Sequence, residues 1–258
     1  MTRTETKQFQ YEIQAYQEDC VNNIVSLFES LRQKINFVEV MTGHHNKHKY
    51  NFPIQDTKNI DIMMETGTGK TFTFIKSIFE LNKNYRYKKF IVLIPTVPIR
   101  EGTKTNLEDT KDYFKSYYAN QKEKEIEAFV YEGGNLSAVK QFIGTSHLSV
   151  LVMTPSSFNS KDNILNRPLE REMNQPELFV TNQEPPKSYL ECLKRLNPIV
   201  IMDEPHRFEG NAFKTYFEGF FQLLLAFWCY LPQEKRQFTF IKCSLCIRQY
   251  FFVSTKFG

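Results

Sequence analysis

Apolar and polar residues follow two different periods along this chain. In the stretch "FQYEIQAYQEDCVNNIVSLFESLRQ", apolar residues recur at helical spacing, which predicts one or two amphipathic helices. Further along, the short apolar runs "IDIMME", "FIVLIP", "IEAFVYE", "LSVLVMTP" and "PIVIMDE" are separated by helix-sized polar segments. Runs of this kind are typical of a parallel sheet that is buried on both faces and connected by crossover helices. The pattern therefore predicts an α/β domain with a mostly parallel sheet flanked by helices.

The same pattern divides the chain into three parts. Residues 1–59 form a helical lead-in with a polar loop, residues 60–219 carry the strands and helices, and residues 220–258 form a hydrophobic tail. Within the central part, residues 160–197 contain several prolines and no clear period. They predict a long excursion before the last strand of the sheet.

The composition restricts the possible partners and cellular locations of the protein. A hydrophobic content of 41% is enough for a real core, and a net charge of +4 is too small to indicate a nucleic-acid partner by itself. Five cysteines form an odd, irregular set, and we see no signal peptide, so reduced thiols in the cytoplasm are expected. The most apolar run, "FFQLLLAFWCY", is about half the ~20 residues that a membrane-spanning helix needs. We therefore expect no membrane partner.

Two groups of candidate metal ligands are weak. His44, His45 and His48 lie among Lys, Asn and Gly residues, which favours a solvated loop over a metal site. Cys243 and Cys246 form a C-x-x-C pair without a second pair or a supporting histidine. We assign neither group a role.

The stretch "METGTGKT", residues 64–71, has the composition of a phosphate-binding loop. Such a loop needs glycines so that backbone N–H groups can surround phosphates, a lysine to neutralise them, and a Ser or Thr hydroxyl for Mg²⁺. The context fits, because a predicted strand precedes the loop and a predicted helix follows it. One departure is Met64, which stands where the consensus has glycine. The stretch predicts ATP and Mg²⁺ as cofactors, bound by Thr66, Gly67, Thr68, Gly69, Lys70 and Thr71.

A second candidate element is "PIVIMDEPHRF", a buried strand that carries Asp203 and Glu204 at its carboxyl end. Ligands bind at this edge of open α/β sheets. In such a site, Asp203 would hold Mg²⁺ through a water molecule, and Glu204 would orient and deprotonate the attacking water. The acidic pair therefore predicts nucleotide hydrolysis.

Together, "METGTGKT" and "DEPH" resemble motifs of superfamily 2 helicases and translocases. The residues of these motifs are most similar to those of the Res subunit of type III restriction-modification enzymes, whose acidic motif begins "DEP". Three further stretches agree with this family in the same order: "AYQEDCV", "VLIPTVPIREG" and "VMTPSSFN". The resemblance covers residues 10–220 and implies a RecA-like P-loop ATPase domain.

The resemblance assigns roles to residues outside the phosphate loop. It implies that Gln17 reads the adenine edge of ATP and that His206 couples the nucleotide site to bound DNA. Two strand-end segments of the family contact the backbone of a single DNA strand. Hydroxyl, guanidinium and backbone N–H groups suit phosphate oxygens and read no bases. The matching residues here are Thr96, Arg100, Thr154 and Ser156.

The resemblance also implies a reaction and a partner. The complete Res subunit uses ATP to move along DNA and cleave it, and a separate modification (methyltransferase) subunit recognises the DNA sequence. Such motors need a second RecA-like domain and a nuclease domain, which the resemblance places beyond residue 258, so we expect an inactive fragment. Two alternatives remain open: another superfamily 2 DNA helicase, and a stand-alone P-loop regulator that uses ATP as a switch.

The tail has an unusual composition. Its 39 residues contain one acidic residue, eight phenylalanines, the only tryptophan and three of the five cysteines. The family has a motif similar to "FGATFP" at this distance from "DEPH", where this chain has "FWCYLP". With TAC for Tyr230 and permitted codons elsewhere, the bases that encode "FWCYLP" read Phe-Gly-Ala-Thr-Phe-Pro one position later. The tail is therefore predicted to be out-of-frame translation, and a native hydrophobic helix and strand is the alternative.

Overall fold

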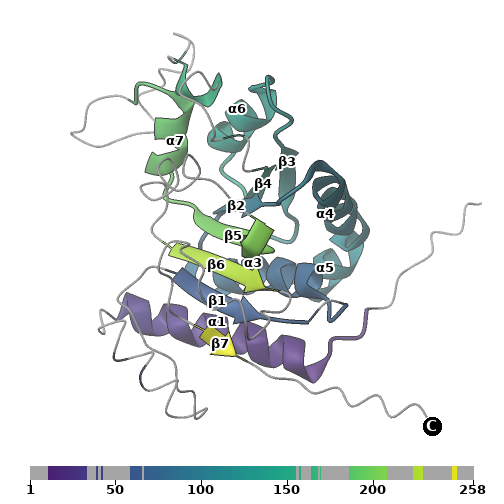
Figure 1. Cartoon of the computed structure of the whole chain (residues 1–258). Coiled ribbons are helices and arrows are strands. Elements are labelled where there is room, and N and C mark those ends of the chain that lie inside the picture. The colour runs from purple at the N-terminus through teal and green to yellow at the C-terminus, as the bar shows by residue number, and fades with distance from the viewer. Residues whose placement is uncertain are drawn as a thin grey trace, which may run out of the picture.

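The computed structural model describes residues 11–33, 39, 42, 59–65, 67–154, 157, 164–167, 169, 186–207, 223–228 and 246–248. A seven-stranded sheet runs through its centre in the order β3-β4-β2-β5-β6-β1-β7 (Figure 1). All of its strand pairs are parallel. The strands are β1 (Asn59–Met63), β2 (Lys89–Leu93), β3 (Glu127–Val130), β4 (Ser149–Met153), β5 (Ile199–Asp203), β6 (Leu223–Trp228) and β7 (Cys246–Arg248).

Helices cover both faces of this sheet. Figure 1 shows α6 and α7 together at one end of the view and α1 at the other. The helices are α1 (Ala15–Arg32), α3 (Lys70–Tyr85), α4 (Val97–Asp109), α5 (Lys111–Tyr117), α6 (Ser137–Gly144) and α7 (Tyr189–Arg195), with 3₁₀ turns η2 (Ile164–Asn166) and η5 (Pro205–Arg207). The fold is therefore the predicted RecA-like α/β class, with a parallel sheet flanked by helices.

The two faces of the sheet bury two separate hydrophobic cores. Along β2, Phe90 and Val92 belong to one core, whereas Ile91 and Leu93 belong to the other. This alternation follows from the two-residue period of a strand, and burial on both faces explains why the runs read as continuously apolar. The first core is completed by α1, α3 and α5, and the second by α6 and α7.

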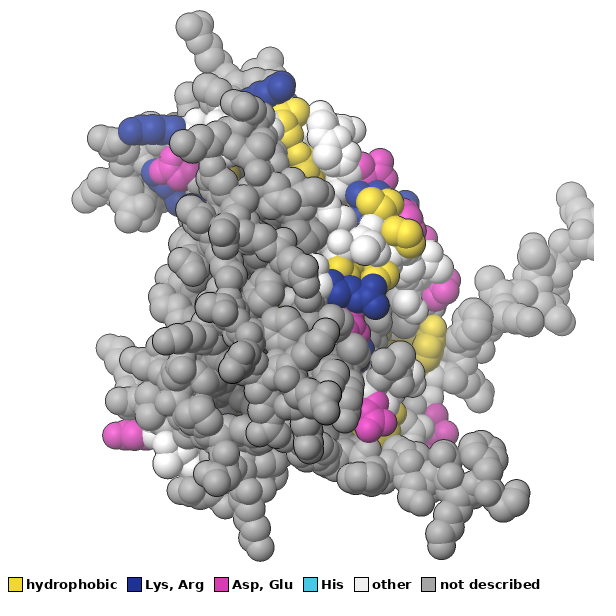
Figure 2. Space-filling view, viewed as in Figure 1, with side chains coloured by type: hydrophobic (Ala, Val, Ile, Leu, Met, Phe, Trp, Pro, Cys, Tyr) yellow, Lys and Arg dark blue, Asp and Glu magenta, His cyan; other side chains and the backbone are white. Residues whose placement is uncertain are grey.

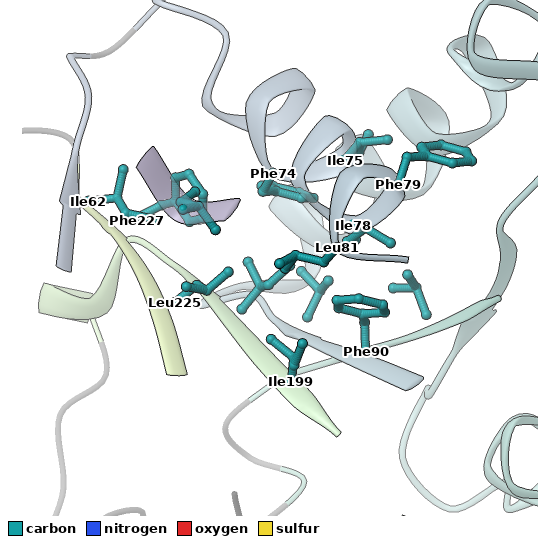
Figure 3. Packing of buried hydrophobic residues seen from close by; sticks show 14 of the residues in the cluster. Ile62, Phe74, Ile75, Ile78, Phe79, Leu81, Phe90, Ile199, Leu225 and Phe227 are labelled. Atoms are coloured by element: carbon teal, nitrogen blue, oxygen red, sulfur yellow. The ribbon is translucent and has the colours of Figure 1, made fainter. Parts of the chain in front are cut away.

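The helix that follows the phosphate loop is held firmly in the first core. Figure 3 shows Phe74, Ile78 and Leu81 of α3 facing Phe90 and Leu225 of the sheet. All five side chains are fully buried. Burial of a side chain of this size contributes about 1.5–3 kcal/mol. The start of α3, where the loop ends, is therefore a fixed point of the fold.

Part of the predicted tail lies inside the sheet. Strand β6 pairs with β5 on one side and with β1 on the other. Its residues 224–227 are buried. Strand β7 adds an edge by pairing with β1, and Cys246 is its first residue. The out-of-frame origin of the tail stays a prediction. None of the described helices combines the length and apolarity needed to cross a membrane.

Candidate nucleotide-binding site

The phosphate loop connects the end of β1 to the first residue of α3, Lys70. Gly67 and Gly69 have φ angles of 82° and 81°, a left-handed conformation that side chains rarely adopt. Gly69 is the N-cap of α3 and has no side chain to cap the first N–H groups of the helix. Uncapped N–H groups and the helix dipole together form a site for an anion. The two glycines thus have the conformational role that the sequence predicts.

The amide of Gln17, on α1, is bonded to the phosphate loop. Its Nε2 donates to the Thr68 carbonyl at 2.9 Å, and its Oε1 accepts from the Gln14 N–H at 3.1 Å. The Tyr16 hydroxyl donates to the same Thr68 carbonyl at 3.1 Å. A Cβ at Gly69 would lie only 2.4 Å from Gln17 Nε2. Helix α1 therefore fixes the shape of the loop, whereas the contact of Gln17 with adenine stays a prediction.

The loop lysine and the strand-end glutamate form an ion pair. Lys70 Nζ lies 2.5 Å from Glu204 Oε1, and only 11% and 12% of the two side chains is exposed. Glu204 has a φ of 55°, which is unusual for a residue with a side chain. Its backbone N–H donates to the carbonyl of Phe227 at 2.9 Å. The end of strand β6 thus holds Glu204 in this conformation, opposite Lys70.

Asp203 lies beside this pair, at the end of β5. Burial, together with the nearby Glu204 charge, raises the pKa of its carboxyl to about 6, against the opposing effect of Lys70 and Arg207. Its Oδ1 is buried and has no hydrogen-bond partner among the described residues. A buried oxygen in this state is costly, and a divalent cation would satisfy it. Asp203 is therefore suited to bind Mg²⁺. The second predicted magnesium residue, Thr71, is half-buried in the first turn of α3.

Two predicted DNA contacts lie on the same edge of the sheet. Thr96 follows β2 and Thr154 follows β4, and these neighbouring strands are in register, with Leu93 opposite Met153. Thr96 is exposed at the start of α4, and Thr154 is largely buried. The edge also carries Glu204, because all strands run in parallel. The structure therefore brings the predicted nucleotide and DNA residues to one edge.

Arg100 is engaged with protein groups. Its guanidinium donates to Glu101 Oε1, from Nη2 at 2.8 Å and from Nε at 3.1 Å, and to the Tyr131 carbonyl at 3.2 Å. The residue is 8% exposed. In this arrangement Arg100 joins α4 to the segment after β3, and its contact with DNA stays a prediction. Thr66 and Ser156 lie outside the described residues, as do His44, His45, His48 and Cys243, and only the backbone of His206 is described.

A groove that the sequence pattern did not predict lies next to Thr154. The groove has a volume of about 390 Å³ and is lined by Gly133 and Gly134 after β3, by Thr154 and Ser157, and by Arg167 after η2. Both glycines have positive φ angles, 46° and 82°. The doublet in "VYEGGN", directly after a predicted strand, was a signal for a functional turn at this edge.

The loop between β1 and α3, the ion pair and the buried aspartate lie at the carboxyl edge of the parallel sheet, as in a P-loop α/β domain. A sequence model of the family described as "Type III restriction enzyme, res subunit" matches residues 10–227. The chain therefore belongs to the Res subunit family of type III restriction enzymes, and it forms the helicase-like domain of that family.

Individual relatives agree with this assignment. The chain is 32% identical to the Res subunit of the type III restriction-modification enzyme EcoP15I of Escherichia coli over 182 residues, 64% of this chain and 17% of the relative. It is 31% identical to the EcoPI Res subunit of Escherichia phage P1 over 217 residues, 75% of this chain and 21% of the relative. The chain thus spans about a fifth of these relatives' lengths. Among solved structures, the UvsW helicase from Bacteriophage T4 is similar, with a TM-score of 0.48 and 15% identity, over 90% of this chain and 57% of that one.

Proposed function

We propose that this chain is the part of a Res subunit that binds ATP with Mg²⁺ and contacts a single DNA strand. The observation that carries the proposal is the placement of Lys70, Asp203 and Glu204 around the phosphate loop. Lys70 and Glu204 are paired, and Asp203 has a buried oxygen without a hydrogen-bond partner among the described residues. This set of groups suits a magnesium nucleoside triphosphate.

Each residue then has a defined task. The Lys70 ammonium would neutralise phosphate oxygens, and the Thr71 hydroxyl and the Asp203 carboxylate would hold Mg²⁺. The Glu204 carboxylate accepts the proton of the attacking water. When bound, Mg-ATP supplies the free energy of phosphoryl transfer, which the complete Res subunit would use to move along DNA and cleave it.

The carboxyl edge of the sheet at β2, β4 and β3 would contact DNA. Thr96 and Thr154 at neighbouring strand ends, the glycine turn and Arg167 offer hydroxyl, N–H and guanidinium groups that suit a phosphate backbone. The names of the relatives combine restriction with modification. We therefore propose a modification subunit as the protein partner and the cytoplasm as the site of action.

Dependence of nucleotide binding on Mg²⁺ tests this proposal. A fluorescent ATP analogue is titrated into wild type, Asp203→Asn and the control Asp112→Asn, whose carboxylate is exposed on α5, with Mg²⁺ and with EDTA. EDTA should weaken binding to wild type and to the control about tenfold, and should have little further effect on Asp203→Asn. Equal responses of all three proteins would exclude Asp203 as the magnesium residue.

DNA binding separates the remaining alternatives. A fluorescent single-stranded oligonucleotide should bind wild type, and binding should weaken as salt is raised. A chain that binds Mg-ATP and no DNA would instead be a P-loop regulator that uses ATP as a switch. A DNA-binding chain that does not associate with a modification subunit would contradict the proposed protein partner.

We also propose that the tail from about residue 220 is out-of-frame translation, with the family motif encoded one base later from codon 227. The composition shift in the tail supports this proposal, and β6 is in the sheet up to Trp228. The match to the family ends at residue 227. The gene sequence tests it: the frame one base later should read Phe-Gly-Ala-Thr-Phe-Pro across codons 227–232. Any other reading would mean that the tail is native.

A further inference from the structure

A second pocket adjoins the groove at Thr154. It has a volume of about 550 Å³ and lies between the first turn of α6, η2 and α7. Gly134, Ile164 and Arg167 line both the pocket and the groove, so the two are continuous. The volume is within the range of small-molecule sites, about 300–1,000 Å³. The pocket is therefore a side cavity of the proposed DNA track, which is the edge formed by Thr96, Thr154, the glycine turn and Arg167.

One of the residues that line the pocket has a buried hydroxyl. Tyr189, the first residue of α7, lines the pocket and is 1% exposed. Its hydroxyl is buried and has no hydrogen-bond partner among the described residues. Buried tyrosine hydroxyls usually have a partner, because an unsatisfied polar group costs about 1–3 kcal/mol. A ligand in the pocket would supply the missing partner.

The charges around the pocket are positive. Lys140 and Arg167 line it, and none of the described residues that line it is acidic. Lys140 Nζ lies 5.9 Å from the centre of the Tyr189 ring. Among the described residues, the Arg167 guanidinium forms no ion pair. Figure 2 shows Lys and Arg side chains at the top of the view, over α6 and α7, with acidic side chains beside those over α7. The pocket thus favours an anionic ligand.

The N-terminus of α6 adds to this preference. The Asn135 side chain accepts from the Ser137 N–H at 2.8 Å, and both residues line the pocket. Other N–H groups of the first helical turn have no partner within the helix, and the helix dipole favours a negative charge there. Leu136 and Ile164 give the same pocket an apolar wall. Cations and an apolar wall together match a phosphate joined to a sugar and a base.

We propose that this pocket holds one nucleotide of the bound DNA strand, turned out of the track that passes Thr154. Its phosphate contacts Lys140 and Arg167, and its sugar or base accepts a hydrogen bond from the Tyr189 hydroxyl. The nucleotide leaves the track at Arg167, because Arg167 is the charged residue among the described residues that line both cavities. This inference rests on the proposed binding of DNA and adds a second contact region to it.

The test uses the whole chain and a fluorescent oligothymidylate at several salt concentrations. Lys140→Ala and Arg167→Ala should each weaken binding about three- to tenfold and reduce the slope of log affinity against log salt by about 0.7. Tyr189→Phe removes one hydroxyl and no charge, so it should weaken binding severalfold with an unchanged slope. Lys194→Ala is the control, since Lys194 is an exposed cation of the same helix, α7, that does not line the pocket.

The outcomes separate this inference from the proposed function. If Lys140→Ala, Arg167→Ala and Tyr189→Phe bind the strand as wild type does, the pocket is not a DNA subsite, although the track can still be correct. If wild type binds no strand, both proposals fail. Thymidine monophosphate is tested as a free ligand: binding as tight as that of the strand would assign the pocket to a free nucleotide instead. Binding of the fluorescent ATP analogue should be equal in all variants.

Discussion

The ammonium of Lys70 lies 2.5 Å from Oε1 of Glu204, so these two charged groups beside the phosphate loop are paired with each other. Phosphate oxygens would compete with Glu204 for the same ammonium. The two residues should therefore have opposite effects on nucleotide binding, although either substitution breaks the same ion pair. This opposition gives the first prediction.

Glu204→Gln should tighten binding of a fluorescent ATP analogue. The substitution removes the carboxylate that competes for Lys70 and lowers the negative charge near the phosphates. An effect of about 1 kcal/mol corresponds to about fivefold in affinity. The control is Glu108→Gln, because Glu108 is exposed on α4. Weaker binding by Glu204→Gln would mean that Glu204 helps to hold the nucleotide.

The two loop glycines should differ in their tolerance of alanine. Both need a left-handed backbone, which costs about 1–3 kcal/mol for a residue with a side chain. At Gly67 no atom lies within 4 Å of an added Cβ, whereas at Gly69 the Cβ would meet Gln17 Nε2 at 2.4 Å. Urea unfolding should show a larger loss of stability for Gly69→Ala than for Gly67→Ala. Adding Gln17→Ala to Gly69→Ala should recover part of the difference, and equal losses would contradict this packing.

Many features of the site follow from the sequence, and the contacts that could not be predicted share one physical reason. The phosphate loop and Asp203 were predictable, because strand, glycine turn and helix are local features. The engagement of Gln17 with Thr68 and of Arg100 with the Tyr131 carbonyl depends on contacts between distant segments. Local periodicity carries no information about such partners. A prediction from motif position alone therefore finds the residue and misses what it touches.

The position of β6 in the sheet could not be predicted from the sequence either. An apolar run next to an unusual composition looked like a separate tail, yet residues 223–228 form the strand between β5 and β1. Strand order depends on the path of the whole chain, which a short run does not encode. The carbonyl that fixes Glu204, that of Phe227, comes from this strand.

Leu225→Ala tests whether β6 is part of the folded core. Leu225 is fully buried between the two neighbouring strands. Its truncation should lower the free energy of unfolding by about 2–5 kcal/mol. Val97→Ala is the control, because Val97 is 53% exposed and should change stability by less than about 0.5 kcal/mol. Equal unfolding midpoints in urea would place β6 outside the cooperative core.

Two cysteines should resist thiol reagents. Burial raises the pKa of Cys20 to about 12 and, with the help of the Glu191 charge, that of Cys192 to about 11. At pH 8 the thiolate fraction of Cys20 is then about one in ten thousand. Iodoacetamide followed by peptide mapping should leave both residues unmodified in native protein at pH 8 and modify both in urea. Rapid native labelling of either one at that pH would contradict its burial.

Binding of Mg-ATP by Lys70→Ala is the most direct measurement of the central claim. The fluorescent ATP analogue is titrated into wild type, Lys70→Ala and Lys83→Ala, which removes an exposed cation of the same helix. Urea unfolding of each protein shows whether it is folded. The account predicts that Lys70→Ala is folded and binds at least about tenfold more weakly, while Lys83→Ala binds as wild type does. Equal affinity of folded Lys70→Ala and wild type would contradict the assignment of this loop as the nucleotide site.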